Sequence, residues 1–196
     1  RDAAAIENLR KIDTLIVDKT GTLTEGRPRQ TDFELLHADE RDARALAASL
    51  AARSDHPVSR AIAEFGKQQG LALSEVSDFA ALAGRGVRGV IAGEVYHLGN
   101  HRLVEELGLC SPALEAQLDA LERQGKTVVL LLDRSGPLAL FAVADTVKDS
   151  SRQAIAELHQ LGIKTVMLTG DNPHTAQAIA AVVGIDRAEG NLLPAD

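Results

Sequence analysis

The chain is poor in aromatic residues and in clustered positive charge, and both shortages exclude classes of protein. Aromatic residues make up 3% of its 196 residues, with no tryptophan and one tyrosine. Proteins that bind single-stranded nucleic acid stack bases on aromatic side chains, so this composition gives such a function little support. The net charge is −7 and no block of lysine and arginine occurs. The chain therefore lacks the basic footprint of a nucleic-acid-binding protein, and we expect no nucleic-acid partner.

Cysteine and long apolar runs are scarce as well. Cys110 is the only cysteine, which excludes an internal disulfide and a site built from several thiolates and best fits a reducing, cytosolic environment. The longest apolar runs, 128–132 and 138–144, are far shorter than the roughly 20 residues of a membrane-spanning helix. No signal-peptide pattern opens the chain. It starts at Arg1 and stops at Asp196, and we expect it to be a piece of a longer protein.

Apolar residues nevertheless make up 45% of the chain, enough for a core. Two short runs rich in β-branched residues, 12–17 and 164–168, predict buried strands. Helical patterns over 149–161 and 173–183 flank the second run. This alternation of strand and helix predicts a parallel α/β sheet.

The middle of the chain has a different pattern, one of helices and hairpins. Two strand-like runs flank the turn sequence 133–137 and predict an antiparallel hairpin, and glycines interleaved with valines indicate further turns. We therefore expect an interrupted α/β domain, residues 1–28 and 144–196, with an inserted α+β domain, residues 29–143. The helices predicted for the insert cover residues 40–53, 57–69, 100–108 and 112–123.

A polar loop follows the first predicted strand and begins at Asp18. Open α/β sheets bind ligands at the carboxyl ends of their strands. The lysine, hydroxyls and backbone N–H groups of such a loop can surround a phosphate. A solvated turn would explain Asp18 and Lys19 alone more simply, so the interpretation depends on the whole run Asp18-Lys19-Thr20-Gly21-Thr22.

The run DKTGTLTEG, residues 18–26, resembles the phosphorylation signature of P-type ATPases. Further similarity covers nearly the whole chain, in the order seen in the heavy-metal-transporting class. Thr169-Gly170-Asp171 resembles the second phosphate-site motif, Ser54-Asp55-His56-Pro57 the Ser-Glu-His-Pro motif of the nucleotide domain, and Gly84-Arg85-Gly86 and Gly99-Asn100 the glycine motifs of that class.

The resemblance implies a haloacid dehalogenase-like Rossmannoid phosphorylation domain, cut short at its C-terminal end, with an inserted nucleotide-binding domain built on an antiparallel sheet. Family members continue with a phosphate-contacting lysine and a Gly-Asp-Gly motif that completes the Mg²⁺ site, and they carry transmembrane and actuator domains. We expect a piece that holds nucleotide but has an incomplete phosphorylation site. It would lie at the cytoplasmic face of the cell membrane, as part of an integral membrane protein, without contacting lipid itself.

The resemblance also implies roles for the residues of the phosphate site. Asp18 would be the nucleophile that takes the γ-phosphoryl group of ATP, a role that suits a carboxylate ionised at pH 7. An Asp18 oxygen and the Thr20 backbone carbonyl would bind Mg²⁺, and Asp171 would act at the domain hinge. The residues implied to surround the phosphate are Lys19, Thr20, Gly21, Thr22, Thr169, Gly170 and Asp171. Asn172 and Pro173 also suit the start of a helix, whose dipole favours an anion nearby.

For the nucleotide, the resemblance implies that His56, followed by Pro57, orients ATP near its adenine. Gly84 and Gly86 would let the backbone approach the ligand closely, and Gly99 with Asn100 would close the same wall. A helix-capping histidine and turns between short strands explain the same residues without a ligand. The chain departs from the class at Ala51, where a glutamate usually stands. We therefore expect weaker selectivity among nucleotides.

Two alternatives to a metal-exporting ATPase stay open. Phosphatases of the same superfamily usually carry a second aspartate two residues after the nucleophile, and Thr20 at that position argues against a soluble phosphatase. A non-catalytic nucleotide-binding module is the other alternative. The sequence of residues 145–194 resembles pumps for zinc, cadmium or lead slightly more than pumps for copper. No zinc-type spacing occurs, so Cys110 is interpreted as a packing residue and the remaining histidines as surface residues: His37, His97, His101, His159 and His174.

Overall fold

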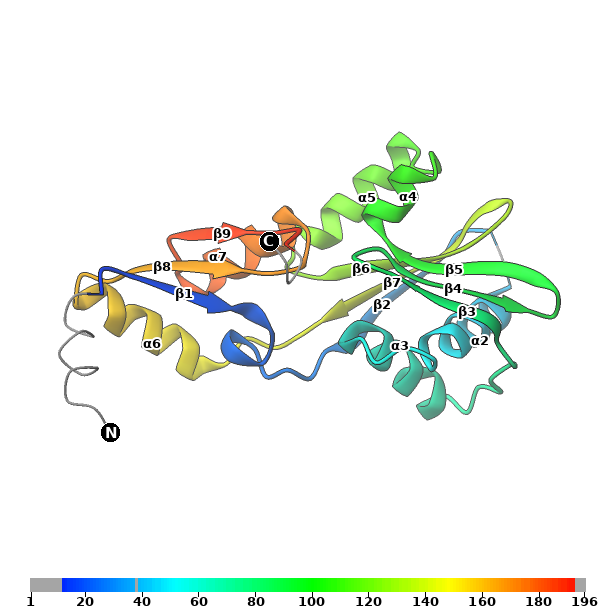
Figure 1. The fold of residues 1–196 in the computed structure, drawn as a ribbon, viewed down its shortest axis with the longest axis horizontal. Coiled ribbons are helices and arrows are strands. Elements are labelled where there is room, and N and C mark those ends of the chain that lie inside the picture. Colours follow the sequence, from blue (N-terminus) through cyan, green and yellow to red (C-terminus); the bar gives the residue numbers. More distant parts are fainter. Residues whose placement is uncertain (1–11, 38, 193–196) are drawn as a thin grey trace.

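The computed structural model describes residues 12–37 and 39–192, which form two separate sheets (Figure 1). The smaller sheet is parallel and three-stranded, in the order β1-β8-β9. Two helices and Leu23 contribute to the core beside this sheet, around the fully buried Met167. The elements are β1 (Thr14–Asp18), α6 (Asp149–Gln160), β8 (Lys164–Leu168), α7 (Pro173–Val183) and β9 (Arg187–Glu189).

The larger sheet is antiparallel and six-stranded, in the order β2-β7-β6-β5-β4-β3. Figure 1 shows one helix pair, α2 and α3, on one face of this sheet and a second pair, α4 and α5, on the other. The elements are β2 (Arg29–Leu35), α2 (Glu40–Ala51), α3 (Pro57–Gln68), β3 (Ser77–Leu82), β4 (Gly86–Ile91), β5 (Glu94–Asn100), α4 (His101–Glu106), α5 (Pro112–Glu122), β6 (Thr127–Asp133) and β7 (Gly136–Ala144).

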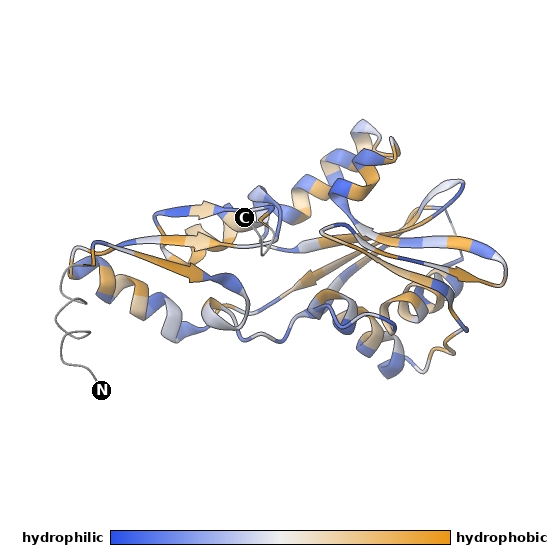
Figure 2. Ribbon diagram, in the orientation of Figure 1, coloured by the Kyte–Doolittle hydropathy of each residue, from blue (hydrophilic) through white to orange (hydrophobic). Residues whose placement is uncertain are grey.

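The continuous apolar run of β6 follows from this sandwich. Val129 and Leu131 pack on the side of α2 and α3, whereas Val128 and Leu130 pack on the side of α4 and α5. A strand covered on both faces has no reason to alternate with polar residues. Figure 2 shows hydrophobic residues running along the central strands, whereas the helices alternate between hydrophobic and hydrophilic residues. No helix in residues 12–37 and 39–192 is long and apolar enough to cross a membrane.

The predicted fold class, a parallel sheet interrupted by an α+β insert with an antiparallel sheet, is confirmed. The boundaries at 28/29 and 143/144 remain a prediction. The prediction that the first strand is buried is wrong, because Ile16 is 60% exposed. β1 is an edge strand, and the chain moves from β1 to β8 to β9 in one direction. Right-handed crossovers then place α6 and α7 on the same face, and no other helix of residues 12–37 and 39–192 covers the opposite face.

A buried ion pair joins α4 to α5. His101 Nδ1 lies 3.3 Å from Glu122 Oε2, and the Glu122 side chain is 1% exposed. The other ring nitrogen, Nε2, lies 3.0 Å from Glu115 Oε2. Hydrogen bonding to Glu122 is the main reason that the pKa of His101 rises to about 9, against the opposing effect of burial. With 13% of its side chain exposed, His101 is not the surface histidine that the sequence suggested.

This pair predicts a pH dependence of stability. The folded-state pKa of His101 is about 9, above an unfolded value of about 6.5. The stabilising contribution is therefore complete below about pH 6.5 and is lost as the pH rises through the folded-state value. In denaturant titrations of metal-free protein, the free energy of unfolding should fall between about pH 6.5 and 8.5. The fall should be on the order of 2 kcal/mol larger for wild type than for His101→Gln. His37→Gln, at an exposed position, should follow wild type, and equal pH profiles for wild type and His101→Gln would contradict the assignment.

Candidate active site

The two motifs predicted to surround a phosphate meet at one edge of the parallel sheet. Asp18, the last residue of β1, lies in register with Leu168, the last residue of β8. Each strand then continues into a polar loop, 19–23 after β1 and 169–172 after β8. Segments 150 residues apart in the sequence thereby form one site at the carboxyl ends of parallel strands, where open α/β sheets bind ligands.

Asp171 makes contacts with both loops of this site and with the inserted unit. Its Oδ2 pairs with Lys19 Nζ, and both side chains are nearly buried, at 14% and 11% exposure. Its Oδ1 accepts a hydrogen bond of 3.1 Å from the Thr127 hydroxyl at the start of β6. The Asp171 backbone N–H donates to Thr169 Oγ1 over 3.2 Å. One carboxylate therefore ties both loops of the parallel sheet to the inserted unit.

Asp18 has a contrasting environment. It is exposed, and among the described residues its carboxylate makes no side-chain hydrogen bond or ion pair. The neighbouring Lys19 ammonium is engaged by Asp171 rather than by Asp18. Asp18 therefore offers two free carboxylate oxygens at the edge of the sheet. Oxygen atoms of this kind, with the adjacent Thr20 carbonyl, fit the ligand preference of Mg²⁺.

The loop after Asp18 is held in a tight turn by contacts that sequence reasoning did not identify. Gly21 has a φ of +76°, in the left-handed region that favours glycine. Lys148 Nζ donates to the carbonyls of Gly21 and Thr22 over 2.6 and 3.2 Å. At the far end of the loop, Leu23 is 3% exposed and packs in the core of the parallel sheet. Gly21 and Thr22 thus direct their carbonyls at a lysine, while their role toward phosphate stays a prediction.

Asp145 was also missed, although it fastens the two crossings between the sheets. Its Oδ2 accepts from the Thr24 hydroxyl over 2.5 Å and from the Gly26 N–H over 3.0 Å. Its Oδ1 accepts from the Arg27 N–H over 3.1 Å. The outgoing chain, 24–27, is thereby bound to the residue that directly follows β7 on the way back. The change of pattern after this residue was the one available signal in the sequence.

The loop after β8 leads into α7 as the sequence suggested. Asn172 caps the helix, since its Oδ1 accepts from the Thr175 N–H over 2.9 Å, and Pro173 occupies the first position. Backbone N–H groups at a helix start lack intrahelical partners and favour an anion; here Pro173 supplies none and that of Thr175 is bound by Asn172, so the N–H groups of Asn172 and His174 are the ones left for an anion. The segment after β9 closes the other side, where the Asn191 N–H donates to the Asp171 carbonyl over 2.6 Å. A Cβ on Gly190 would lie 2.6 Å from that same carbonyl oxygen, which explains a glycine there.

His56 is the N-cap of α3, and its side chain is exposed. Its Nδ1 accepts from the Val58 N–H over 3.4 Å, so the neutral ring carries its proton on Nε2 and presents a donor. The pKa of His56 lies below its usual value, first because of partial desolvation. The charge of Asp171 opposes this shift and that of Lys19 adds to it, which places His56 within electrostatic reach of both. The structure thus brings the predicted nucleotide motif toward the predicted phosphate motif.

The glycine motifs also come together, but with packing reasons of their own. Gly86 and Gly99 are directly opposite each other on β4 and β5. A Cβ on Gly86 would lie 2.2 Å from the Leu98 carbonyl oxygen, and a Cβ on Gly99 would lie 2.2 Å from Leu103 Cδ2. These glycines therefore permit close approach of protein to protein. Approach of the backbone to a nucleotide remains a prediction.

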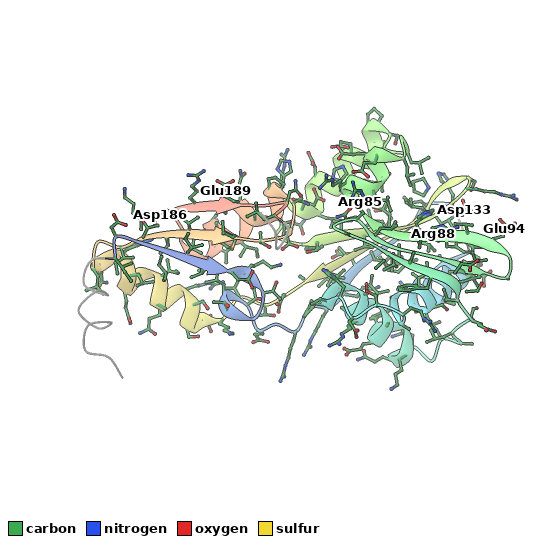
Figure 3. All side chains as sticks on the ribbon, viewed as in Figure 1. Arg85, Arg88, Glu94, Asp133, Asp186 and Glu189 are labelled. Atoms are coloured by element: carbon green, nitrogen blue, oxygen red, sulfur yellow. The ribbon has the colours of Figure 1, made fainter. Side chains whose placement is uncertain are left out.

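Asn100 and Arg85 hold the turn between β3 and β4. Asn100 Nδ2 donates to the Gly84 carbonyl over 3.0 Å, while its Oδ1 caps α4. Arg85 Nε donates to Glu106 Oε2 over 2.5 Å. Figure 3 shows Arg85 at the end of the six-stranded sheet nearer the parallel sheet, with Glu94 at the opposite end. Ala51, the last residue of α2, is by contrast fully buried in the core between the helix pair α2 and α3 and the six-stranded sheet.

The Asp145 contacts predict a large effect of substitution. Asp145→Ala removes one acceptor from three donors, Thr24, Gly26 and Arg27. Hydrogen bonds to a charged group contribute about 1.5–3 kcal/mol each, so we expect a loss of about 3 kcal/mol in unfolding free energy. Hydrogen exchange at residues 24–27 should accelerate more than exchange in β6. The matched control is Asp149→Ala, at an exposed carboxylate in the first turn of α6. Equal stabilities of the two variants would contradict the role of Asp145.

Comparison with known proteins agrees with this geometry. A family profile described as haloacid dehalogenase-like hydrolase matches residues 12–196. A copper-transporting P-type ATPase of Rhizobium leguminosarum bv. viciae is 42% identical over 195 residues, which cover 99% of this chain and 23% of that protein. A probable cadmium-transporting ATPase of Staphylococcus aureus is 41% identical over 198 residues, covering 97% of this chain and 25% of that protein. The chain thus spans about a quarter of the length of these curated relatives.

Solved structures share the fold. The catalytic domain of the CPx-ATPase CopB-B superimposes with a TM-score of 0.75 and 27% identity, covering all of this chain and 68% of that one. A zinc-transporting PIB-type ATPase in its E2.Pi state gives a TM-score of 0.64 and 34% identity over 98% of this chain and 31% of that one. The chain belongs to the haloacid dehalogenase-like hydrolase family and, within it, is a catalytic region of the heavy-metal P-type ATPase group.

Proposed function

We propose that this chain is the ATP-binding and aspartyl-phosphorylation region of a pump that couples ATP hydrolysis to export of a heavy-metal cation. The observation that carries the proposal is the convergence of the loops after β1 and β8, which Asp171 joins to each other through Lys19 and to the inserted unit through Thr127. A nucleotide held at His56 can then direct its phosphates toward the edge of the parallel sheet. The proposed partners are ATP, Mg²⁺, and the transmembrane and actuator domains of the pump at the cytoplasmic face of the membrane.

In this proposal Asp18 is the nucleophile. One carboxylate oxygen forms a bond to the γ-phosphorus of ATP, the bond between that phosphorus and the β–γ bridging oxygen breaks, and ADP leaves. The exposed and unpaired state of the Asp18 carboxylate supports this role, because a nucleophile must reach its substrate without first breaking an ion pair. Mg²⁺, held by Asp18 and the Thr20 carbonyl, would neutralise charge on the phosphates.

Lys19, Thr169 and the start of α7 are proposed to receive the phosphoryl oxygens. The Lys19 ammonium is the positive charge nearest to Asp18 along the chain, and Asp171 fixes its position. Thr169 is 6% exposed, and its hydroxyl is held within the loop by Asp171. Donors fixed before the reaction stabilise developing charge without reorganisation.

Thr20 supports a phosphoenzyme that lasts. A phosphatase of this superfamily would use an aspartate at this position as general acid and base, and a threonine hydroxyl cannot take that role near neutral pH. The aspartyl phosphate would then survive long enough for a conformational change. A relative named for copper and one named for cadmium match this region at 42% and 41% identity. The proposed preference for zinc, cadmium or lead therefore rests only on the sequence resemblance of residues 145–194.

The nucleophile assignment predicts loss of the phosphoenzyme. In the full-length protein, Asp18→Asn should abolish acid-stable, hydroxylamine-sensitive labelling from γ-³²P-ATP, because the amide keeps the shape but loses the charge. Asp13→Asn, at an exposed carboxylate just before β1, should keep the label. Undiminished label in the Asp18 variant would refute the assignment. Fast hydrolysis of p-nitrophenyl phosphate without a labelled intermediate would favour the soluble phosphatase.

The nucleotide assignment predicts a specific binding defect in this chain alone. His56→Gln should weaken ATP binding about tenfold in calorimetric titrations, because one hydrogen bond donated by the neutral imidazole, of about 1.4 kcal/mol, is lost. His37→Gln, at an exposed histidine outside both motifs, should bind like wild type. Gly86→Val is unsuitable as a probe, because its Cβ would strike the Leu98 carbonyl and disturb the sheet. Equal affinity in the His56 and His37 variants would show that the nucleotide binds elsewhere.

A further inference from the structure

Three side chains of different chemistry converge where α4 meets α5, away from the loops at Asp18. His101 Nε2 lies 3.0 Å from Glu115 Oε2, and Cys110 Sγ lies 2.9 Å from the same oxygen. The third separation, from Cys110 Sγ to His101 Nε2, is 3.8 Å. One nitrogen, one sulfur and one oxygen thus surround a common point.

These separations are close to those of a tetrahedral metal site. Zinc bonds nitrogen and oxygen at about 2.0–2.1 Å and sulfur at about 2.3 Å, so two ligands of one tetrahedral ion lie roughly 3.3–3.6 Å apart. The observed values of 3.0, 2.9 and 3.8 Å bracket that range. Moving the Glu115 carboxylate, which is 43% exposed, by roughly 0.7 Å from Cys110 Sγ brings the shortest separation, 2.9 Å, to the tetrahedral value.

The arrangement behind His101 is also typical of a metal ligand. Its second ring nitrogen, Nδ1, lies 3.3 Å from the carboxylate of Glu122, which is 1% exposed. Metal-ligating histidines usually bond a carboxylate or carbonyl through the nitrogen that does not face the ion, which fixes the orientation of the ring. Glu122 thus directs Nε2 toward Cys110 and Glu115.

We propose that His101, Cys110 and Glu115 bind one borderline-soft divalent cation of the Zn²⁺ or Cd²⁺ kind, with solvent as the fourth ligand. The thiolate and imidazole favour this class over Mg²⁺ or Ca²⁺. On binding, the Cys110 thiol and the Nε2–H of the protonated His101 each release a proton to solvent. The site is separate from the proposed transport and phosphorylation chemistry, and the sequence spacing of its ligands, eight and four intervening residues, explains why no zinc pattern was recognised.

The position of the site connects it to a predicted nucleotide motif. His101 directly follows Asn100, whose side chain holds the Gly84 carbonyl and caps α4. An ion at His101 fixes the start of α4 against the loop at Cys110 and the first turn of α5. Amide signals of Gly84 and Asn100 should therefore shift when the ion binds.

A second ligand set shares His101 and serves as the competing outcome. His101, Asp119 and Glu122 also have donor atoms within 4.8 Å of one another. That set contains two carboxylates and no thiol, so an ion bound there would give no sulfur-to-metal charge-transfer band. Cys110 and Asp119 therefore distinguish the two sites.

The test is a Cd²⁺ titration of the metal-free 196-residue chain, followed in the ultraviolet for the sulfur-to-metal charge-transfer band. Wild type should show the band at one equivalent. Cys110→Ser should lose it and bind at least tenfold more weakly, and Glu115→Gln should keep a band but bind about tenfold more weakly. Asp119→Asn and the distant control His37→Gln should behave like wild type. Circular dichroism checks that each variant folds, and Glu115→Gln, at a half-exposed position on α5, is the variant least expected to disturb folding.

The proposal is overturned if Cys110→Ser and Glu115→Gln both retain wild-type affinity, because the ion then binds elsewhere. It is also overturned if Asp119→Asn, rather than Cys110→Ser, removes binding, since the oxygen-rich set would then be the site. Neither result depends on ATP, so failure here leaves the proposed phosphorylation chemistry untouched.

Discussion

The arrangement of the candidate active site depends on the Asp171 carboxylate. A carboxylate that is only 14% exposed must have its lone pairs satisfied, because burying an unpaired charge costs several kcal/mol. Here the partners come from three places: Lys19 after β1, Thr169 after β8, and Thr127 at the start of β6. Satisfying one charge therefore fixes the two phosphate loops against each other and against the insert. The same pair withdraws Lys19 from Asp18 and leaves the proposed nucleophile unpaired.

An inserted unit is joined to its host by two chain crossings, and here both pass through one point. Asp145 binds the N–H groups of the outgoing chain at Gly26 and Arg27 while lying on the returning chain itself. A second anchor lies at α7, where the buried Thr175 hydroxyl donates to the Lys126 carbonyl over 2.9 Å. With the Thr127 hydroxyl bound to Asp171, the insert is thus held to the parallel-sheet unit at Asp145, Asp171 and Thr175.

The sequence predicted the elements whose patterns are local, and missed those that depend on partners. The helix start at Asn172 and Pro173 and the hairpin of β6 and β7 follow from capping and turn chemistry within a few residues. Strand β2 mixes charged and apolar residues and is defined by pairing with β7, more than 100 residues later. Strand β9 has only three residues, too few for any period to show. Burial of β1 could not be judged either, because it depends on which strands and helices cover it.

The same distinction between local patterns and long-range contacts applies to the candidate site. Asp18, Lys19 and Asp171 lie within motifs, so the sequence could single them out, and the structure brings their loops together, while their roles stay a prediction. Asp145 and Lys148 act through single contacts with distant backbone groups, which no short pattern encodes. Gly86 and Gly99 were noticed as glycines, yet the reason visible in the structure is the close approach of β4, β5 and Leu103. His101 was dismissed for its spacing, although its environment is set by Glu115 and Glu122 across a helix corner. Spacing along the chain identifies a ligand set only when the ligands share one local element. Where a loop and two helices each supply one donor, the separation between atoms in the folded protein is the informative quantity.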